Sequence, residues 1–313
     1  MATKGAQQRT QKGQDVCSFT EAQARDYFES RRWPHGPVCP HCGGVKVTRL
    51  PATGKARPGT IQCNDCRQQF TVTVGTVMED THLPLAKWAM AFHLMCSSKK
   101  GVSALQLQRN LGLGSYRTAW HLSHRIREAM RCEPAASKLK GQVQADETYV
   151  GGKPRYRNAD PKRTGRGTTK TPVFLVVETD GNAHARPVDR VDAKTLRAAM
   201  QEAVCPTSQI VTDDFPTYPT ATKGFAGHAT VTHSTGEYVG PGGIHTNTAE
   251  SYFALLKRGV HGTFHHVSKR HLSRYCDEFS FRWNGRKVSD VERRDLAVAG
   301  ADGKRLMYRQ PAN

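Results

Sequence analysis

The chain has 313 residues and a formal net charge of +19, from 46 Lys and Arg against 27 Asp and Glu. Its length is enough for two or three domains with buried cores. So large an excess of positive charge favours a polyanionic partner, and nucleic acid is the commonest one. No run approaches the roughly 20 apolar residues of a membrane span, so we expect no membrane association. The polar residues 1–17 predict a flexible tail without a signal peptide.

Four of the nine cysteines form two pairs with the spacing of zinc ligands. Cys39 and Cys42 are separated by two residues, and so are Cys63 and Cys66. Two such turns supply the four thiolates of a tetrahedral, structural Zn²⁺ site. A redox pair is the alternative, although it would need only one of the two turns. We therefore predict a zinc ribbon within residues 18–80.

The other cysteines are scattered and form no even disulfide framework. They are Cys17, Cys96, Cys132, Cys205 and Cys276. This usage is typical of a reducing compartment, so we expect a cytoplasmic protein.

A helical pattern precedes the cysteine pairs, and a strand pattern follows them. Before them, "SFTEAQARDYFESRRW" predicts a short helix, because Thr20 and Gln23 have the spacing of a capping box. After them, "QQFTVTVG" alternates and predicts a strand of the ribbon.

Residues 81–132 predict a helical DNA-binding domain. "VSALQLQRNLGLGSYRTAWHLSHRIREAM" indicates two helices joined by a glycine-containing turn, with Ser115 at the start of the second. In a helix-turn-helix, one side of that second helix would face DNA. The candidates on it are Tyr116, Arg117, His121, His124 and Arg125. An ordinary helical hairpin is the alternative.

From residue 142 the pattern changes to strands and later helices. Residues 133–141 predict a linker, residues 142–290 a catalytic domain, and residues 291–313 a C-terminal tail. Three consecutive strands, a helix, a further strand and later helices indicate an α/β (α+β) domain, with a mixed sheet covered by helices.

Three acids within this domain are candidates for a metal site. Asp146 lies inside the first strand, where an acid is costly to bury without a cation. Asp213 lies at the carboxyl end of a later strand, where open sheets place ligands. Glu250 lies one turn into a helix. Hard divalent cations prefer carboxylate oxygens, and a metal centre of this kind supports in-line phosphoryl displacement.

Four long motifs make a family resemblance specific. "QADETYVGGK", "IVTDDFPTY", "HTNTAESYFALLKRGVHGTFHHVS" and "YCDEFSFRWNGR" closely resemble the DDE-type transposases of the insertion-sequence 1595 family. The cysteine pairs and the order of the domains resemble that family too, over about residues 18–286. The resemblance implies a ribonuclease-H-like catalytic domain that binds Mg²⁺ or Mn²⁺ and acts on DNA ends.

By position, the resemblance makes Asp146, Asp213 and Glu250 the first, second and third acids. Some members of the family have an Asn in the third role, and Asn247 lies one turn before Glu250 on the same helix face. We assign the third position to Glu250, because a carboxylate binds Mg²⁺ better, and keep Asn247 as a further candidate. Lys257 lies two turns later, and the resemblance implies that it contacts DNA near the cleaved phosphate.

Clustered cations provide the expected DNA contacts. The segment 151–170 holds seven Lys and Arg against one Asp, and we expect it to follow phosphates through residues such as Lys153 and Arg155, unless it is a solvated hairpin. Further candidates are Arg258, Lys269, Arg270, Arg282, Asn284 and Arg286. The histidines around them (His261, His265, His266 and His271) lack a clear metal-ligand spacing.

The sequence therefore predicts a nucleoid-associated prokaryotic transposase that binds the terminal inverted repeats of an insertion sequence. It would cleave DNA and transfer strands with Mg²⁺ or Mn²⁺ at Asp146, Asp213 and Glu250, and a homo-oligomer would hold both ends together. Two alternatives remain: a zinc-ribbon DNA-binding regulator with an inactive catalytic domain, and a metal-dependent nuclease without strand transfer.

Overall fold

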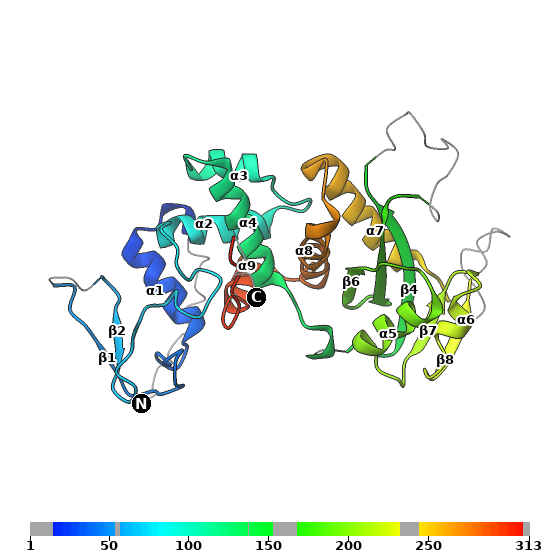
Figure 1. The fold of residues 1–313 in the computed structure, drawn as a ribbon, viewed down its shortest axis with the longest axis horizontal. Coiled ribbons are helices and arrows are strands. Elements are labelled where there is room, and N and C mark those ends of the chain that lie inside the picture. The colour runs from blue at the N-terminus through cyan, green and yellow to red at the C-terminus, as the bar shows by residue number, and fades with distance from the viewer. Residues whose placement is uncertain (1–14, 54–56, 137, 153–167, 232–243, 309–313) are drawn as a thin grey trace, which may run out of the picture.

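The computed structural model describes residues 15–53, 57–136, 138–152, 168–231 and 244–308. The N-terminal elements and a five-stranded sheet lie at opposite ends of an elongated molecule, with helix α8 between them (Figure 1). Among the described residues, no helix is long and apolar enough to cross a bilayer.

The zinc-ribbon region is a helix followed by a small antiparallel sheet. Its elements are η1 (Val16–Ser18), α1 (Glu21–Arg32), β1 (Val47–Arg49), β2 (Ile61–Cys63) and β3 (Gln69–Phe70). The capping box is confirmed, since Thr20 accepts from the Gln23 amide and the Gln23 side chain accepts from the Thr20 amide. Strand β3 is shorter than expected, because the next carbonyls, of Val72 and Val74, accept hydrogen bonds from Arg32 instead of pairing.

Three helices follow: α2 (Leu85–Ser97), α3 (Ala104–Leu111) and α4 (Tyr116–Met130). Helix α3 ends at Gly112, which has the left-handed φ of 57° that glycine tolerates best, and α4 begins after a short turn. Ser115 occupies the N-cap position of α4 without a side-chain capping bond. The two expected helices and the glycine-containing turn are therefore present, and they fit a helix-turn-helix and an ordinary helical hairpin alike.

The C-terminal residues differ from the expected tail. Helix α9 (Asp290–Ala299) packs against α1 and α2, and its Ala297 and Val298 belong to the same buried core. Asp295 accepts hydrogen bonds from Tyr27 (2.6 Å) and Arg31 (2.9 Å) of α1. A helix from the end of the chain thus completes the N-terminal body.

The second body is a mixed sheet with helices on both faces. Its strands are β4 (Gln142–Val150), β5 (Thr171–Glu178), β6 (Ala183–Pro187), β7 (Gln209–Thr212) and β8 (Gly227–Thr230), in the order β6-β5-β4-β7-β8. Strands β4, β5 and β6 pair antiparallel, whereas β7 and β8 continue parallel to β4. This order and these directions confirm the expected ribonuclease-H-like fold.

Two helical layers cover that sheet. The layers are α5 (Ala193–Ala203) with α6 (Tyr218–Ala221), and α7 (Asn247–Gly259) with α8 (Leu272–Asn284). A π-turn (Val260–Phe264) and η6 (Lys269–His271) join α7 to α8, and η2 (Pro134–Ala136) follows α4. The expected linker is not loose throughout, because buried Leu139 donates to the Ala203 carbonyl and accepts from Cys205.

A buried ion-pair cluster joins the two bodies. The Glu278 carboxylate of α8 accepts from Arg127 of α4 (2.6 Å) and from Arg282 (2.5 Å), and all three side chains are almost fully buried. Arg282 also donates to the carbonyls of Met95 and Ser98 in the α2 region. Burial works to raise the pKa of Glu278, but the two adjacent guanidinium groups outweigh it and lower the pKa.

Arg282 was expected to contact DNA, and that prediction was wrong. Its guanidinium lies in the buried junction, where it pairs with Glu278, an acid four residues earlier on the same helix face. Arg286 and Asn284 are also engaged inside the protein, with the carbonyls of Gly181 and Ala183 respectively.

Replacing Glu278 by Gln should destabilise the protein by about 3–5 kcal/mol, because two buried guanidinium groups lose their counter-charge. The matched control is Glu202→Gln, which removes an acid from an exposed pair with Arg186 and should cost under about 1 kcal/mol. Urea unfolding followed by circular dichroism measures both. Equal losses of stability in the two variants would contradict this account of the junction.

Candidate metal centres and nucleic-acid interface

The four paired cysteines come together in the N-terminal body. Their ligand atoms all lie within 4.8 Å of one another. The sulfur of Cys39 is 3.7 Å from that of Cys66, and the sulfur of Cys42 is 3.6 Å from that of Cys63. A tetrahedral Zn²⁺ with Zn–S bonds of about 2.3 Å requires sulfurs roughly 3.8 Å apart. The cluster therefore fits a structural Zn²⁺, as the spacing predicted.

The two turns that carry these cysteines have the same backbone pattern. In the first, the Cys39 amide donates to the Gly44 carbonyl, and in the second the Cys63 amide donates to the Gln68 carbonyl. A Cβ on Gly44 would lie 3.3 Å from the Cys42 and Cys63 sulfurs and 2.4 Å from a carboxylate oxygen of Asp65, so a larger residue there would crowd the cysteine cluster and displace that side chain. Hydrogen bonds from backbone amides, first that of Cys66, lower the pKa of the Cys63 thiol to about 7, which favours the thiolate that binds metal.

Asp146 lies in the middle of the large sheet, on the face that α7 and α8 cover. Its register partner on β5 is Leu175, which belongs to the core beneath those helices. The neighbouring acid Glu147 points to the opposite face, where it accepts a 2.6 Å hydrogen bond from Tyr218 of α6. Strand alternation thus separates two consecutive acids, and Asp146 is the one on the α7 face.

Strand pairing brings Asp213 to the level of Asp146. Strands β4 and β7 are parallel, and their last paired residues are Gln144 and Val211. Two positions further along each strand are Asp146 and Asp213. Asp213 is half-buried, and its carboxylate accepts from the Phe215 amide at 3.2 Å, whereas Asp214 is exposed.

Gln144 attaches the start of α7 to the same face of β4. Its side chain accepts from the Ala249 amide (3.0 Å) and donates to the Thr248 hydroxyl (3.2 Å). Glu250 follows directly, and Asn247 lies one turn before it; both are exposed. Gln144 was not among the candidates, although its place two residues before Asp146 put it on the same face of the strand.

Burial and the charges of neighbouring acids both oppose the ionisation of Asp146. Its pKa is raised to about 7, first by burial, then by the charge of Glu147, and further by the charges of Asp213 and Glu250. Strand register, the Gln144 contacts and these charge effects therefore place the three candidate acids on one face of the sheet, at the level where β7 ends. We name this group (Asp146, Asp213 and Glu250) the carboxylate edge.

The ligand atoms of the carboxylate edge are more widely spaced than the sulfurs of the cysteine cluster. Across the described ranges, the four cysteines are the only group of three or more metal-ligating side chains whose ligand atoms all approach within 4.8 Å. Among the described residues, the histidines of residues 261–271 therefore form no such group. One or two carboxylates with water and phosphate suffice for Mg²⁺, so the carboxylate edge suits a metal held jointly with a substrate.

The expected DNA-contacting cations fall into two groups in the structure. Exposed ones are Arg117 at the start of α4, Lys257 and Arg258 at the end of α7, and Lys269 and Arg270 in η6. Lys269 pairs at 2.9 Å with Asp189, which is itself exposed. Lys153 and Arg155 lie outside the described residues.

Arg125 is in the other group, contrary to expectation. It is buried, donates to the Glu79 carbonyl and stacks on Trp88 at 5.3 Å. It therefore ties α4 to the preceding segment instead of facing solvent. His124, expected on the same side, is also fully buried.

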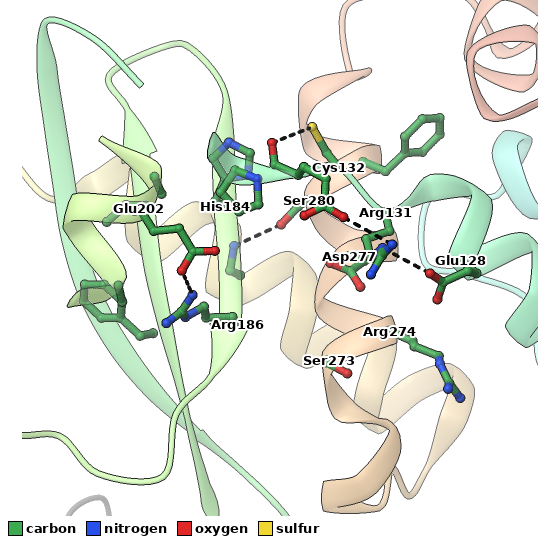
Figure 2. A pocket seen from close by; sticks show the side chains of 18 of the residues that line it. Glu128, Arg131, Cys132, His184, Arg186, Glu202, Ser273, Arg274, Asp277 and Ser280 are labelled. Carbon is green, nitrogen blue, oxygen red and sulfur yellow. Dashed lines mark hydrogen bonds and ion pairs between the residues drawn. The ribbon is translucent and has the colours of Figure 1, made fainter. Parts of the chain in front are cut away.

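A cavity of about 570 Å³ lies at the junction of the two bodies and was not expected from the sequence. Figure 2 shows Arg131 paired with Glu128 on one side and Arg186 paired with Glu202 on the other. None of the carboxylate-edge residues lines it. Its walls are already occupied by ion pairs, so we assign it no catalytic role.

Comparisons with known proteins agree with this architecture. Residues 138–284 match the ISXO2-like transposase domain, and residues 19–69 match the transposase zinc-ribbon domain. A protein of Halobacterium salinarum, described as an uncharacterized protein in transposable element ISH50, is 29% identical over 276 residues. That similarity covers 84% of this chain and 90% of the relative.

Replacing Cys63 by Ser should abolish tight zinc binding, because a structural site needs its four thiolates. The loss should spread to α1, since Ile61 and Phe70 of the ribbon share its core, while the large sheet stays folded. Zinc content and limited proteolysis measure this. Exposed Cys17→Ser is the control and should retain the metal. Retention of zinc by Cys63→Ser would contradict the assignment.

Replacing Asp146 by Asn should raise the melting temperature of the magnesium-free protein at pH 8. The folded pKa of about 7 exceeds the ordinary 3.8, so the wild type loses stability as pH rises between these values, by ~1–4 kcal/mol. The variant has no such loss. At pH 4 the two proteins should therefore differ little. Addition of Mg²⁺ or Mn²⁺ at pH 8 should stabilise only the wild type, and equal stabilisation of both would exclude a metal ligand at Asp146.

Proposed function

Because this chain belongs to the insertion-sequence 1595 family of transposases, we propose that it binds the terminal inverted repeats of an insertion sequence and catalyses Mg²⁺-dependent DNA cleavage and strand transfer. The observation that carries this proposal is the carboxylate edge. Burial and the charges of Glu147, Asp213 and Glu250 raise the pKa of Asp146, and a divalent cation would relieve that repulsion.

The proposed ligands are Asp146, Asp213 and Glu250, with Asn247 as a further oxygen donor on the same face of α7. When bound, Mg²⁺ or Mn²⁺ would favour deprotonation of the attacking oxygen and neutralise the charge at the reacting phosphate. Lys257 and Arg258 lie two turns beyond Glu250 on α7 and are exposed. Their charges would hold the phosphates that flank the cleaved bond.

The proposed reaction has two displacements at phosphorus. In the first, a water oxygen bonds to phosphorus at the element's end, and the 3′-oxygen leaves and takes up a proton. In the second, that 3′-hydroxyl loses its proton and bonds to a phosphorus of target DNA, whose own 3′-oxygen leaves and takes up a proton. Neither step needs a covalent link to the protein, which is consistent with a site made of carboxylates.

Recognition of the ends would fall to the N-terminal body. The start of α4 presents exposed Tyr116 and Arg117, as expected of a helix that enters the major groove. The proposed partners are the element's own ends and target DNA, within the cytoplasm, with a homo-oligomer holding two ends together.

The test is cleavage of a terminal-repeat duplex by purified, zinc-loaded protein with Mg²⁺. Replacing Asp146 by Asn should reduce 3′-end nicking by about 10³-fold or more, since the site loses a central ligand. The matched control is Asp214→Asn, which removes an exposed acid next to Asp213 and should leave nicking within about threefold of the wild type.

A strand-transfer assay with labelled target DNA separates the competing functions. Nicking without joining would indicate a nuclease, and tight, metal-independent binding without nicking would indicate a regulator. Unchanged nicking by Asp146→Asn would remove the proposed mechanism.

A further inference from the structure

A small cavity of about 170 Å³ lies where α4 meets the start of α8 and the segment 306–308. Polar and charged side chains from all three elements line it: His121, His124, Arg270, His271, Arg274 and Tyr308. We name this site the histidine pocket. It is distinct from the carboxylate edge, because none of the three acids lines it.

His124 forms the buried part of the histidine pocket. Its side chain has no exposed surface, and neither ring nitrogen has a hydrogen-bond partner among the described residues. The Nε2 atom of His121 is also buried and has no hydrogen-bond partner among the described residues. A buried polar atom without a partner costs roughly 1–3 kcal/mol, so such a cluster is typical of a site that expects a ligand.

The charges around the pocket indicate whether its ligand would be a cation or an anion. Arg270 and Arg274 line the cavity, the side chain of Arg127 lies near His124, and no Asp or Glu is among the lining residues. Burial first, and then the positive charges of Arg127 and Arg274, lower the pKa of His124 to about 2. Its ring is therefore neutral and can donate one N–H. This setting repels metal cations and favours an anion.

The size and walls of the cavity limit the anion further. A volume of about 170 Å³ is below the roughly 300–1,000 Å³ typical of small-molecule sites. It suits a single oxyanion group with a few waters, at about 30 Å³ per water. Arg274 donates to Nδ1 of His271 at 3.3 Å, so the neutral His271 ring carries its proton on Nε2, and Nε2–H and the other guanidinium N–H groups are the available donors. Trp120, 4.2 Å from His124 and 5.1 Å from His271, closes one side.

We propose that the histidine pocket binds one backbone phosphate of the DNA, with Arg270, His271 and Arg274 as its donors and His124 at its floor. The inference rests on the proposed function. The pocket joins α4, which would read the element's end, to α8 of the catalytic body. A phosphate held there would fix the DNA across both bodies, and therefore the register at which the carboxylate edge meets the strand.

The experiment scans a terminal-repeat duplex with single methylphosphonate substitutions, which neutralise one phosphate at a time. For the wild type we expect a position at which neutralisation weakens binding about 10-fold. In Arg274→Gln that position should become insensitive, and the slope of log affinity against log salt should fall by about 1. His271→Gln is the second variant and should remove the same dependence.

The matched control is Lys223→Gln, which removes one exposed positive charge outside the pocket and should keep the full pattern. Circular dichroism checks that every variant is folded. An unchanged scan in both folded pocket variants overturns the inference. If wild-type binding and nicking of the same duplex persist at that point, the proposed function still stands; absent binding and nicking would remove it as well.

A second arm separates backbone phosphate from free phosphate. Inorganic phosphate is titrated into the full, zinc-loaded chain, and the imidazole ¹⁵N resonances of His124 and His271 are followed. These resonances should shift in the wild type, and terminal-repeat DNA should displace the inorganic phosphate. Inorganic phosphate that stays in the pocket of the DNA complex would show a site for the free anion and overturn the proposal.

Discussion

Burial and three neighbouring acids raise the pKa of Asp146 to about 7, so the folded chain holds a carboxylate where its own surroundings oppose its charge. The sheet imposes this arrangement. Parallel pairing of β4 with β7 brings Asp213 level with Asp146, and Gln144 holds the start of α7, with Glu250, against the same face. Perturbed carboxylates of this kind cluster at functional sites, and in the proposed function a cation would relieve the repulsion. Under the proposed function, the surrounding excess of Lys and Arg would attract phosphates, and the acids would supply oxygen ligands for a metal between them.

The two bodies are coupled by buried charge. Glu278 of α8 binds Arg127 of α4 and Arg282, and Arg282 reaches the carbonyls of α2. Removing one member would leave the others buried without a counter-charge, which is strongly destabilising. Helix α9 strengthens the same join, because it follows α8 in sequence but packs with α1 and α2. Helix α4, which is proposed to read DNA, and the carboxylate edge are thus connected through these buried contacts.

Short sequence patterns predicted much of the fold and of the candidate sites. Contacts between residues far apart in the sequence could not be predicted from them. The cysteine pairs predicted the zinc cluster because each turn is local, and strand alternation placed Asp146. Charge alone does not reveal burial, so Arg125 and Arg282 were wrongly expected to face DNA. Carbonyls that hold them lie far away in the sequence: Arg125 donates to Glu79, 46 positions away, and Arg282 donates to Met95, 187 positions away. Helix α9 was missed, although Ser289 and Glu292 have the spacing of the capping box that the structure confirms.

The most direct test of the carboxylate edge is a crystal structure of the zinc-loaded chain soaked in Mn²⁺, with diffraction collected at the manganese absorption edge. The account predicts an anomalous peak bonded to carboxylate oxygens of both Asp146 and Asp213, at roughly 2.2 Å. Saturating Mn²⁺ with no peak between these two side chains, or a peak bound elsewhere on the sheet, would contradict it.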